Sequence, residues 1–131
     1  MTLAVGDEFA PVGFDITRAD LLGYAAASGD HNPIHADEDV ARSVGLPGVI
    51  AHGMYTLGLA GRAVAGWVPG AEVVELGCKF TKPVVVPAEG AARIEVSGSV
   101  SKVEDGLATL TMQVTCEGVK VLGMPKAVVR A

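Results

Sequence analysis

After residue 70 the hydrophobic and polar residues alternate with a period of two, which is typical of β-strands with one buried face. The alternation predicts strands at residues 73–81, 91–103, 107–116 and 119–129. Asp105-Gly106 and Glu117-Gly118, which separate the last three of these segments, are typical hairpin turns. We therefore expect antiparallel strands throughout the second half of the chain.

The first half of the chain has helical signals instead. Thr17 is a typical N-cap for a helix over residues 18–27, which Gly29 would end. Asp37 is expected to cap a short second helix that runs to Val44. Both segments flank the most polar part of the sequence.

Residues 53–67 form a longer apolar segment that is rich in small side chains. Its glycines each cost close to 1 kcal/mol of helix propensity, and its apolar residues lie on nearly every side, so we expect a tightly enclosed central helix. With a further strand over residues 9–16, the pattern predicts an α+β architecture in which an antiparallel sheet of about five strands wraps one helix. Such a sheet leaves an edge and a face uncovered, which favours a dimer.

Composition and charge exclude several classes of protein. The 131 residues suit one domain, spanning residues 1–131, and half of them are apolar, which argues against disorder. A net charge of −5 argues against a nucleic-acid partner. Asp7 and Glu8 precede any apolar run, so we expect no signal peptide, and the apolar segment is too short to span a bilayer. We expect a cytoplasmic protein with Cys78 and Cys116 reduced, a disulfide being the alternative if they lie on neighbouring strands.

The candidate chemistry lies in residues 28–35, which read SGDHNPIH. Asp30 and His35 set a carboxylate and an imidazole five residues apart, on a turn that Asn32-Pro33 would shape. Such a pair can polarise one water and transfer protons near neutral pH. Taken singly, Asp30 would be a turn residue and His35 a hydrogen-bonded loop histidine. Both groups in one compact turn indicate a catalytic role.

A second segment, AHGM at residues 51–54, begins the apolar helix. The Gly53 N–H would be unpaired there and could bind an oxyanion at the positive end of the helix dipole. His52 is expected to hold the turn, and Ser28 to bond Asp30 or line the pocket. Asp30, His31, His35 and Asp37 could also be metal ligands, but Asn32-Pro33 prevents a shared helical face, so we expect no metal.

These motifs resemble the hydratase 2 motif of the MaoC-like dehydratases and (R)-specific enoyl-CoA hydratases. The family pattern is an aromatic residue, a few small residues and then Ser/Thr-Gly-Asp-x-Asn-Pro-aliphatic-His, and residues 24–35 here read YAAASGDHNPIH. Residues 51–54 match a second landmark of the family, and residues 80–87, FTKPVVVP, match a third. The resemblance extends over nearly the whole chain.

The resemblance implies a hotdog fold, which agrees with the predicted helix and strands. It also implies a homodimer, or a heterodimer with a hotdog paralogue, and an acyl-CoA or acyl-ACP thioester substrate. The implied reaction is reversible hydration of a trans-2-enoyl thioester to the (3R)-3-hydroxyacyl thioester, without a cofactor.

Carried over from the family, Asp30 would activate the water, and His35 would help to hold it and supply the proton at Cα. The Gly53 N–H would bind the thioester carbonyl oxygen and Asn32 would brace the turn. The division of proton transfers between the pair stays open, because coupled groups can share them.

Two other functions compete with hydration. A hotdog thioesterase would attack the thioester carbonyl and release a free thiol. A non-catalytic, acyl-binding hotdog subunit of a dehydratase complex would be expected to lack Asp30 or His35, and both are present.

Overall fold

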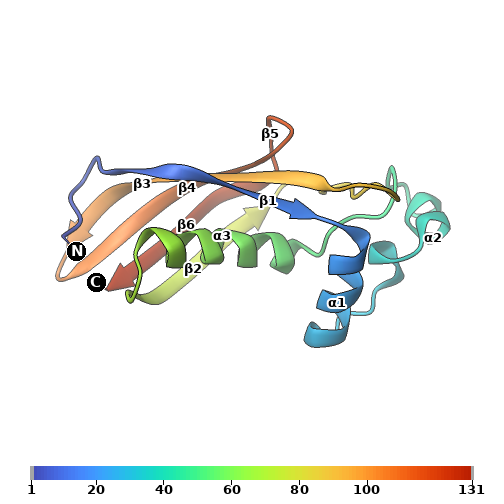
Figure 1. The fold of residues 1–131 in the computed structure, drawn as a ribbon, viewed down its shortest axis with the longest axis horizontal. Helices are drawn as coiled ribbons and strands as arrows, with labels where there is room; N and C mark the ends of the chain where they lie inside the picture. The colour runs from blue at the N-terminus through green and yellow to red at the C-terminus, as the bar shows by residue number, and fades with distance from the viewer. Residues whose placement is uncertain (1, 131) are drawn as a thin grey trace.

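The computed structural model describes residues 2–130, in which the strands form one antiparallel sheet that curves over a long helix (Figure 1). The strands are β1 (Glu8–Ile16), β2 (Glu72–Phe80), β3 (Ala92–Glu104), β4 (Leu107–Cys116), β5 (Val119–Lys120) and β6 (Leu122–Arg130). Their order in the sheet is β1-β3-β4-β6-β2, and β5 pairs with β4. The α+β hotdog architecture expected from the sequence is confirmed.

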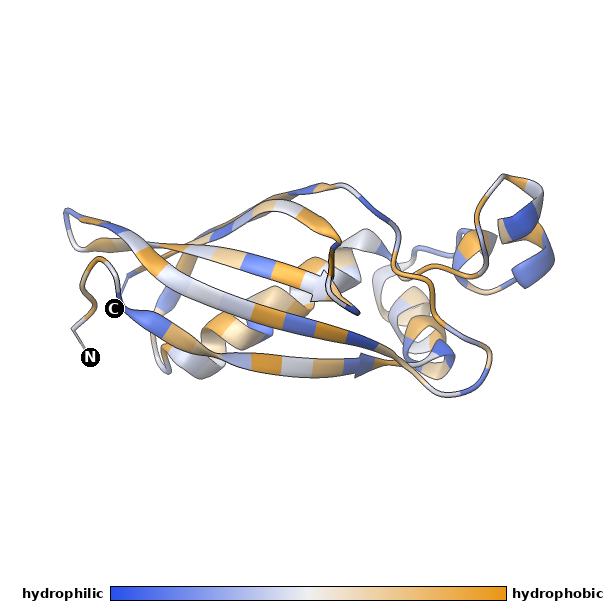
Figure 2. Ribbon diagram, turned by 90° about the horizontal axis from the view of Figure 1, so that it is seen from above, coloured by the Kyte–Doolittle hydropathy of each residue, from blue (hydrophilic) through white to orange (hydrophobic). Residues whose placement is uncertain are grey.

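The strands follow the alternation of the sequence, which Figure 2 shows as successive hydrophobic and hydrophilic bands. Along β4, for example, Leu110, Met112 and Val114 are buried against the helix, whereas the residues between them point away. The hairpin turn between β3 and β4 has φ 54° at Asp105 and 77° at Gly106, as a type I′ turn requires. The predicted turns are therefore confirmed.

One predicted strand, residues 119–129, is divided into β5 and β6. The short β5 pairs only with β4, while β6 lies between β4 and β2. Val121, between the two strands, still donates its N–H to Val114, so the chain changes partners without leaving the sheet. This division raises the strand count to six within residues 2–130.

The short helices of the first half of the chain lie together beyond one end of the sheet (Figure 1). Helix α1 (Arg18–Ser28) begins with a capping box between Thr17 and Asp20 and ends at Gly29, whose φ is 79°. A 3₁₀ turn, η1 (Pro33–His35), leads to α2 (Glu38–Ser43), whose N-cap is Asp37. These helices begin and end as the sequence predicts.

Helix α3 (Gly53–Trp67) has the predicted bounds but is not enclosed on all sides. Leu57, Ala60 and Val64 are buried against the sheet, whereas the opposite face is exposed. A Cβ at Gly58 or Gly66 would meet no atom within 4 Å. The prediction of a fully enclosed helix is wrong for this single chain, because one sheet covers only one side of a helix.

The two cysteines are free. Cys78 lies on β2 and Cys116 at the end of β4, and these strands are separated by β6. Burial raises the pKa of both thiols, so they stay protonated at neutral pH. Within residues 2–130 no helix is long and apolar enough to cross a membrane.

Candidate active site

The turn after α1 is built by side chains that bond to the backbone. Ser28 Oγ accepts from the Asp30 N–H at 3.2 Å, and Asp30 Oδ1 accepts from the Asn32 N–H at 3.2 Å. Asn32 Oδ1 then accepts from the Ile34 N–H at 3.2 Å and caps η1. This succession of turns supports the positions of Asp30 and His35 without any buried side chain in η1.

The segment before α3 fixes the turn from the other side. The Ile50 N–H donates to the Ile34 carbonyl at 3.2 Å, and the Ala51 N–H donates to Val84 at 2.9 Å. His35 Nδ1 lies 2.7 Å from the Ile50 carbonyl oxygen. The turn, the loop and the strand-like segment around Val84 are thereby joined.

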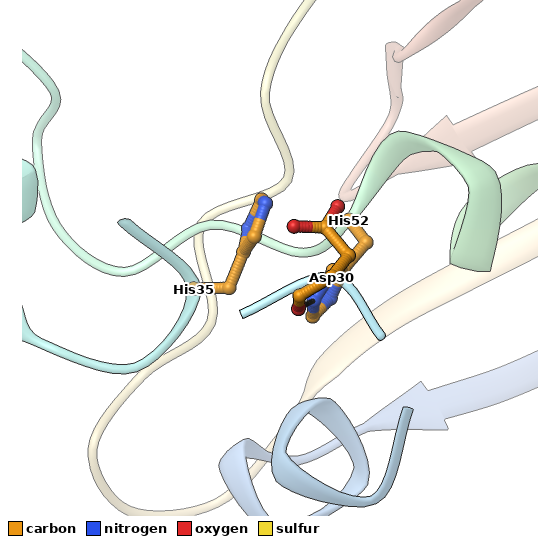
Figure 3. A group of neighbouring side chains, drawn as sticks. All are labelled: Asp30, His35 and His52. Carbon is orange, nitrogen blue, oxygen red and sulfur yellow. Dashed lines mark hydrogen bonds between the residues drawn. The ribbon is translucent and has the colours of Figure 1, made fainter. Parts of the chain in front are cut away.

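Asp30, His35 and His52 come together at this junction, as Figure 3 shows. Each offers one ligating atom, and these atoms all lie within 4.8 Å of one another. The rings of His35 and His52 stack with centroids 3.8 Å apart and planes inclined by 25°. Asp30 is exposed, His35 half-buried and His52 2 % exposed. The sequence brings the first two together, and the fold adds the third.

The hydrogen bonds define the tautomers of both histidines. A carbonyl oxygen can only accept, so the neutral His35 ring carries its proton on Nδ1, toward Ile50, and leaves the lone pair on Nε2. By the same argument, His52 Nε2 donates to the Asp30 carbonyl at 3.2 Å. With His35 as this neutral tautomer, its Nε2 and the oxygens of the Asp30 carboxylate are both hydrogen-bond acceptors.

His52 is held as the neutral imidazole. Burial lowers the pKa of His52, and the neighbouring His35 lowers it as well, while the Asp30 carbonyl and carboxylate oppose the shift. Its Nδ1 has no hydrogen-bond partner among residues 2–130.

A cavity of about 420 Å³ opens beside this group. It is lined by Asp30, His35, Ile50, Ala51, His52, Gly53, Met54, Thr56, Phe80, Thr81, Lys82, Pro83, Val84, Val121 and Leu122. No side chain caps the start of α3, where Gly53 and Met54 line the cavity, so the first N–H groups of the helix lack that partner. A Cβ at Gly53 would lie 2.8 Å from the Phe80 ring, so a larger residue here would require that exposed ring to move.

Two residues that the sequence analysis placed at the site lie outside the cavity. Ser28 and Asn32 shape the turn by hydrogen bonds and do not line the cavity. Thr56 and Leu122 line it but were not predicted from the sequence. The spacing of Thr56, one helical turn after Gly53, is a signal that could have placed it on the same face.

The stacked rings are poorly arranged for a metal ion. A metal lies in the ring plane along the lone pair of each histidine ligand, and the lone pairs of two nearly parallel rings do not converge on one point. Of the three groups in the cluster, only Asp30 takes no part in the stacking. Asp30 and His35 are better suited to holding a small hydrogen-bonding molecule.

The fold and the site define a hotdog domain with a carboxylate and an imidazole close together near the N-terminus of its central helix. Residues 3–121 match the MaoC like domain family, and the chain belongs to that family. It is 31% identical over 114 residues to the (R)-specific enoyl-CoA hydratase of Aeromonas caviae, covering 86% of this chain and 84% of that protein. It is 44% identical over 73 residues to 3-hydroxyacyl-thioester dehydratase X of Mycobacterium tuberculosis, covering 56% of this chain and 25% of that protein.

Solved structures agree with this assignment. A MaoC-like dehydratase superimposes with a TM-score of 0.92 at 35% identity, covering 98% of this chain and 40% of that one. The (R)-hydratase from A. caviae superimposes with a TM-score of 0.87 at 25% identity, covering 98% and 97%. The chain spans a quarter to about half of the length of several curated relatives, among them the mycobacterial dehydratases X and Y.

Proposed function

We propose that this domain catalyses the reversible hydration of a trans-2-enoyl thioester, carried on CoA or acyl carrier protein, to the (3R)-3-hydroxyacyl thioester. The observation that carries the proposal is the Asp30/His35 pair beside the uncapped start of α3. Relatives named (R)-specific enoyl-CoA hydratase and 3-hydroxyacyl-thioester dehydratase support it.

The two acceptors of the pair suit a single water molecule. A water that donates one hydrogen to Asp30 and the other to His35 Nε2 turns its oxygen lone pair toward a third point, where Cβ of the enoyl group would lie. As the C–O bond forms at Cβ, one water proton passes to the pair and a proton from the pair is delivered to Cα. The hydroxyl and the proton that are added together make up one water.

Charge that develops on the thioester oxygen is stabilised at the start of α3. When water adds to Cβ, the π electrons move through Cα to the carbonyl oxygen, which becomes enolate-like. The Gly53 N–H and the positive end of a 15-residue helix would bind this oxygen. Because an acid–base pair and an oxyanion site are sufficient for this reaction, the proposal includes no cofactor or metal.

The remaining site residues have supporting roles in this proposal. Ser28 and Asn32 hold the turn in place through the bonds described above. The aliphatic lining of the cavity, from Val84, Val121 and Leu122, suits an acyl chain.

We also propose that the domain pairs with a second hotdog chain, an identical copy or a paralogue. The sheet ends at β2, where Val73 and Val74 are each 41% exposed, and the outer face of α3 carries small uncovered residues. An unpaired strand edge next to a smooth helical face suits another copy of the same fold. A cytoplasmic location stays a prediction.

One assay distinguishes hydration from the two alternatives. Purified protein is mixed with crotonyl-CoA, and the loss of enoyl-thioester absorbance is followed while free thiol is measured in parallel. Absorbance loss without thiol is the expected result, and thiol release would identify a thioesterase. If neither signal changes with crotonyl-CoA, longer enoyl-CoA and enoyl-ACP substrates are tried, and inactivity with all of them would favour the non-catalytic subunit.

A further inference from the structure

His52 contacts both members of the pair, each in a different way. Its Nε2–H donates to the Asp30 carbonyl, and the face of its ring stacks on His35. Figure 3 shows the three side chains meeting from separate segments, the turn after α1, η1 and the residue before α3. A buried side chain therefore reaches the backbone of one reacting residue and the ring of the other.

One tyrosine contacts the His52 ring, and a second tyrosine contacts the first. Tyr24 of α1 meets the His52 ring edge-on, with centroids 4.8 Å apart and planes inclined by 63°. Tyr55 of α3 meets Tyr24 at 5.2 Å and 90°. This row of rings connects α3 and α1 to the turn, so the orientation of His52 follows from two helices.

A histidine costs more free energy at position 52 than an apolar ring would. Nδ1 is buried without a partner among the described residues, which costs free energy that a phenylalanine would avoid. An imidazole supplies what phenylalanine cannot, a flat ring that also carries an N–H donor at Nε2. Both properties are used, since one contacts His35 and the other contacts Asp30.

We propose that His52 is a positioning residue, which orients the His35 ring by stacking and holds the Asp30 backbone by its Nε2–H, so that carboxylate and imidazole converge on one water. The proposal rests on the hydration function proposed above. The titratable groups that face His52 are Asp30, His35 and, from α1, Tyr24. A neutral ring leaves the stacked face free of positive charge, and burial favours that state by lowering the pKa of His52.

Three substitutions separate the two contacts. His52→Phe keeps the flat ring but removes the donor, His52→Gln keeps a donor near the Nε2 position but removes the ring, and His52→Ala removes both. We expect kcat for enoyl-thioester hydration to fall on the order of 10²-fold in His52→Ala and less in the other two, because small misplacements of catalytic groups have large effects on rate. KM should change little. His31→Gln, at the exposed neighbour of Asp30, is the matched control and should behave as wild type.

Thermal unfolding distinguishes an effect of His52 on the geometry of the site from an effect on the stability of the fold. His52→Phe should unfold close to the wild-type temperature, because it removes the unpartnered Nδ1 together with the Nε2–H bond to Asp30. Unchanged kcat in all three variants would overturn the proposal. A fall in kcat that matches a loss of folded protein in each variant would overturn it equally, since His52 would then serve stability alone.

Nuclear magnetic resonance tests the same contacts without any substrate. The chain has three histidines, so His31→Gln and His52→Phe together assign the signals of all three. We expect wild type to show His35 as the Nδ1–H tautomer, His52 as the Nε2–H tautomer and through-space contacts between the rings. His35 should keep one ring orientation in His52→Phe and lose it in His52→Ala.

Wild-type protein without contacts between the His35 and His52 rings would refute the positioning role, whatever its activity. Protein that shows these contacts but hydrates no enoyl thioester would refute the proposed function alone and support the positioning of His35 by His52.

Discussion

The sheet and the site end of the molecule bury very different amounts of apolar side chain. β4 alone buries Ala108, Leu110, Met112 and Val114, whereas α1 buries Leu21, α2 buries Ala41 and η1 buries none. The helices of the site end are joined by capping bonds, turns and an ion pair between Arg18 and Glu38, while the loops beside them bury Val49, Ala51, Val84 and Val86. The stability of the sheet and the geometry of the site thus depend on different contacts, and we expect that each can be changed without the other.

The largest effect on activity is expected from substitutions of Asp30 and His35, the proposed catalytic pair. Asp30→Asn or His35→Ala should lower kcat about 10²–10⁴-fold, because general acid–base catalysis contributes that much. Both side chains are at least partly exposed, so the melting temperature should stay close to that of wild type. Activity is followed with an enoyl-thioester substrate and folding by circular dichroism, with His31→Gln as control. Substantial turnover in either variant would contradict the assignment of the pair.

A substitution in the core of the sheet should lower stability and leave kcat nearly unchanged. Leu110→Ala removes a fully buried side chain from β4 and should lower the free energy of unfolding by about 2–5 kcal/mol. The molecules that remain folded should keep kcat near the wild-type value, since Leu110 does not line the cavity. Urea denaturation measures the first quantity. Leu22→Ala on α1, where the side chain is 59% exposed, is the control and should cost far less.

The two faces of α3 give a smaller contrast. A Cβ at Gly61 would lie 3.1 Å from Leu76 Cδ2, so Gly61→Leu should cost about 1–3 kcal/mol by overpacking. Gly58 faces open space in the single chain, and Gly58→Ala should add up to about 1 kcal/mol through helix propensity. Denaturant titration compares the two. Equal costs at both positions would mean that a partner covers the outer face as closely as the sheet covers the inner one.

The weakest expected effect is that of the ion pair between α1 and α2. Its hydrogen bond to Arg18 holds the pKa of Glu38 below the usual range, although burial opposes this. A lowered carboxylate pKa contributes stability that is present above the unfolded pKa and is lost as pH falls through the folded pKa. Glu38→Gln should therefore lower the melting temperature slightly at neutral pH and not at strongly acidic pH. The same difference at both pH values would show that charge is not the cause.

The fold was largely predictable because its signals are local. Alternation placed the strands, and Thr17, Gly29 and Asp37 placed the helix ends within a residue or two. The exposure of Gly58 was not predictable, because apolar and small residues on the outer face of α3 look the same whether or not something covers them. Periodicity reports which residues can be buried, and topology decides which of them are.

The part of the site whose residues are close together in the sequence was predictable. Asp30 and His35 lie in one turn, so their proximity follows from sequence. The stacking of His52 on His35 depends on how the loop before α3 returns past η1, and Leu122 reaches the cavity from β6. Long-range contacts of this kind leave no spacing in the sequence from which they could be read.

The turn at residues 28–35 is fastened by hydrogen bonds whose partners are mostly exposed to solvent. Water can replace such bonds one at a time, whereas the sheet can lose its core only all at once. Amide hydrogens of the turn should therefore exchange with deuterium in minor openings, while those of β4 should exchange only through global unfolding. We therefore expect the turn to open and reclose many times within one lifetime of the folded sheet.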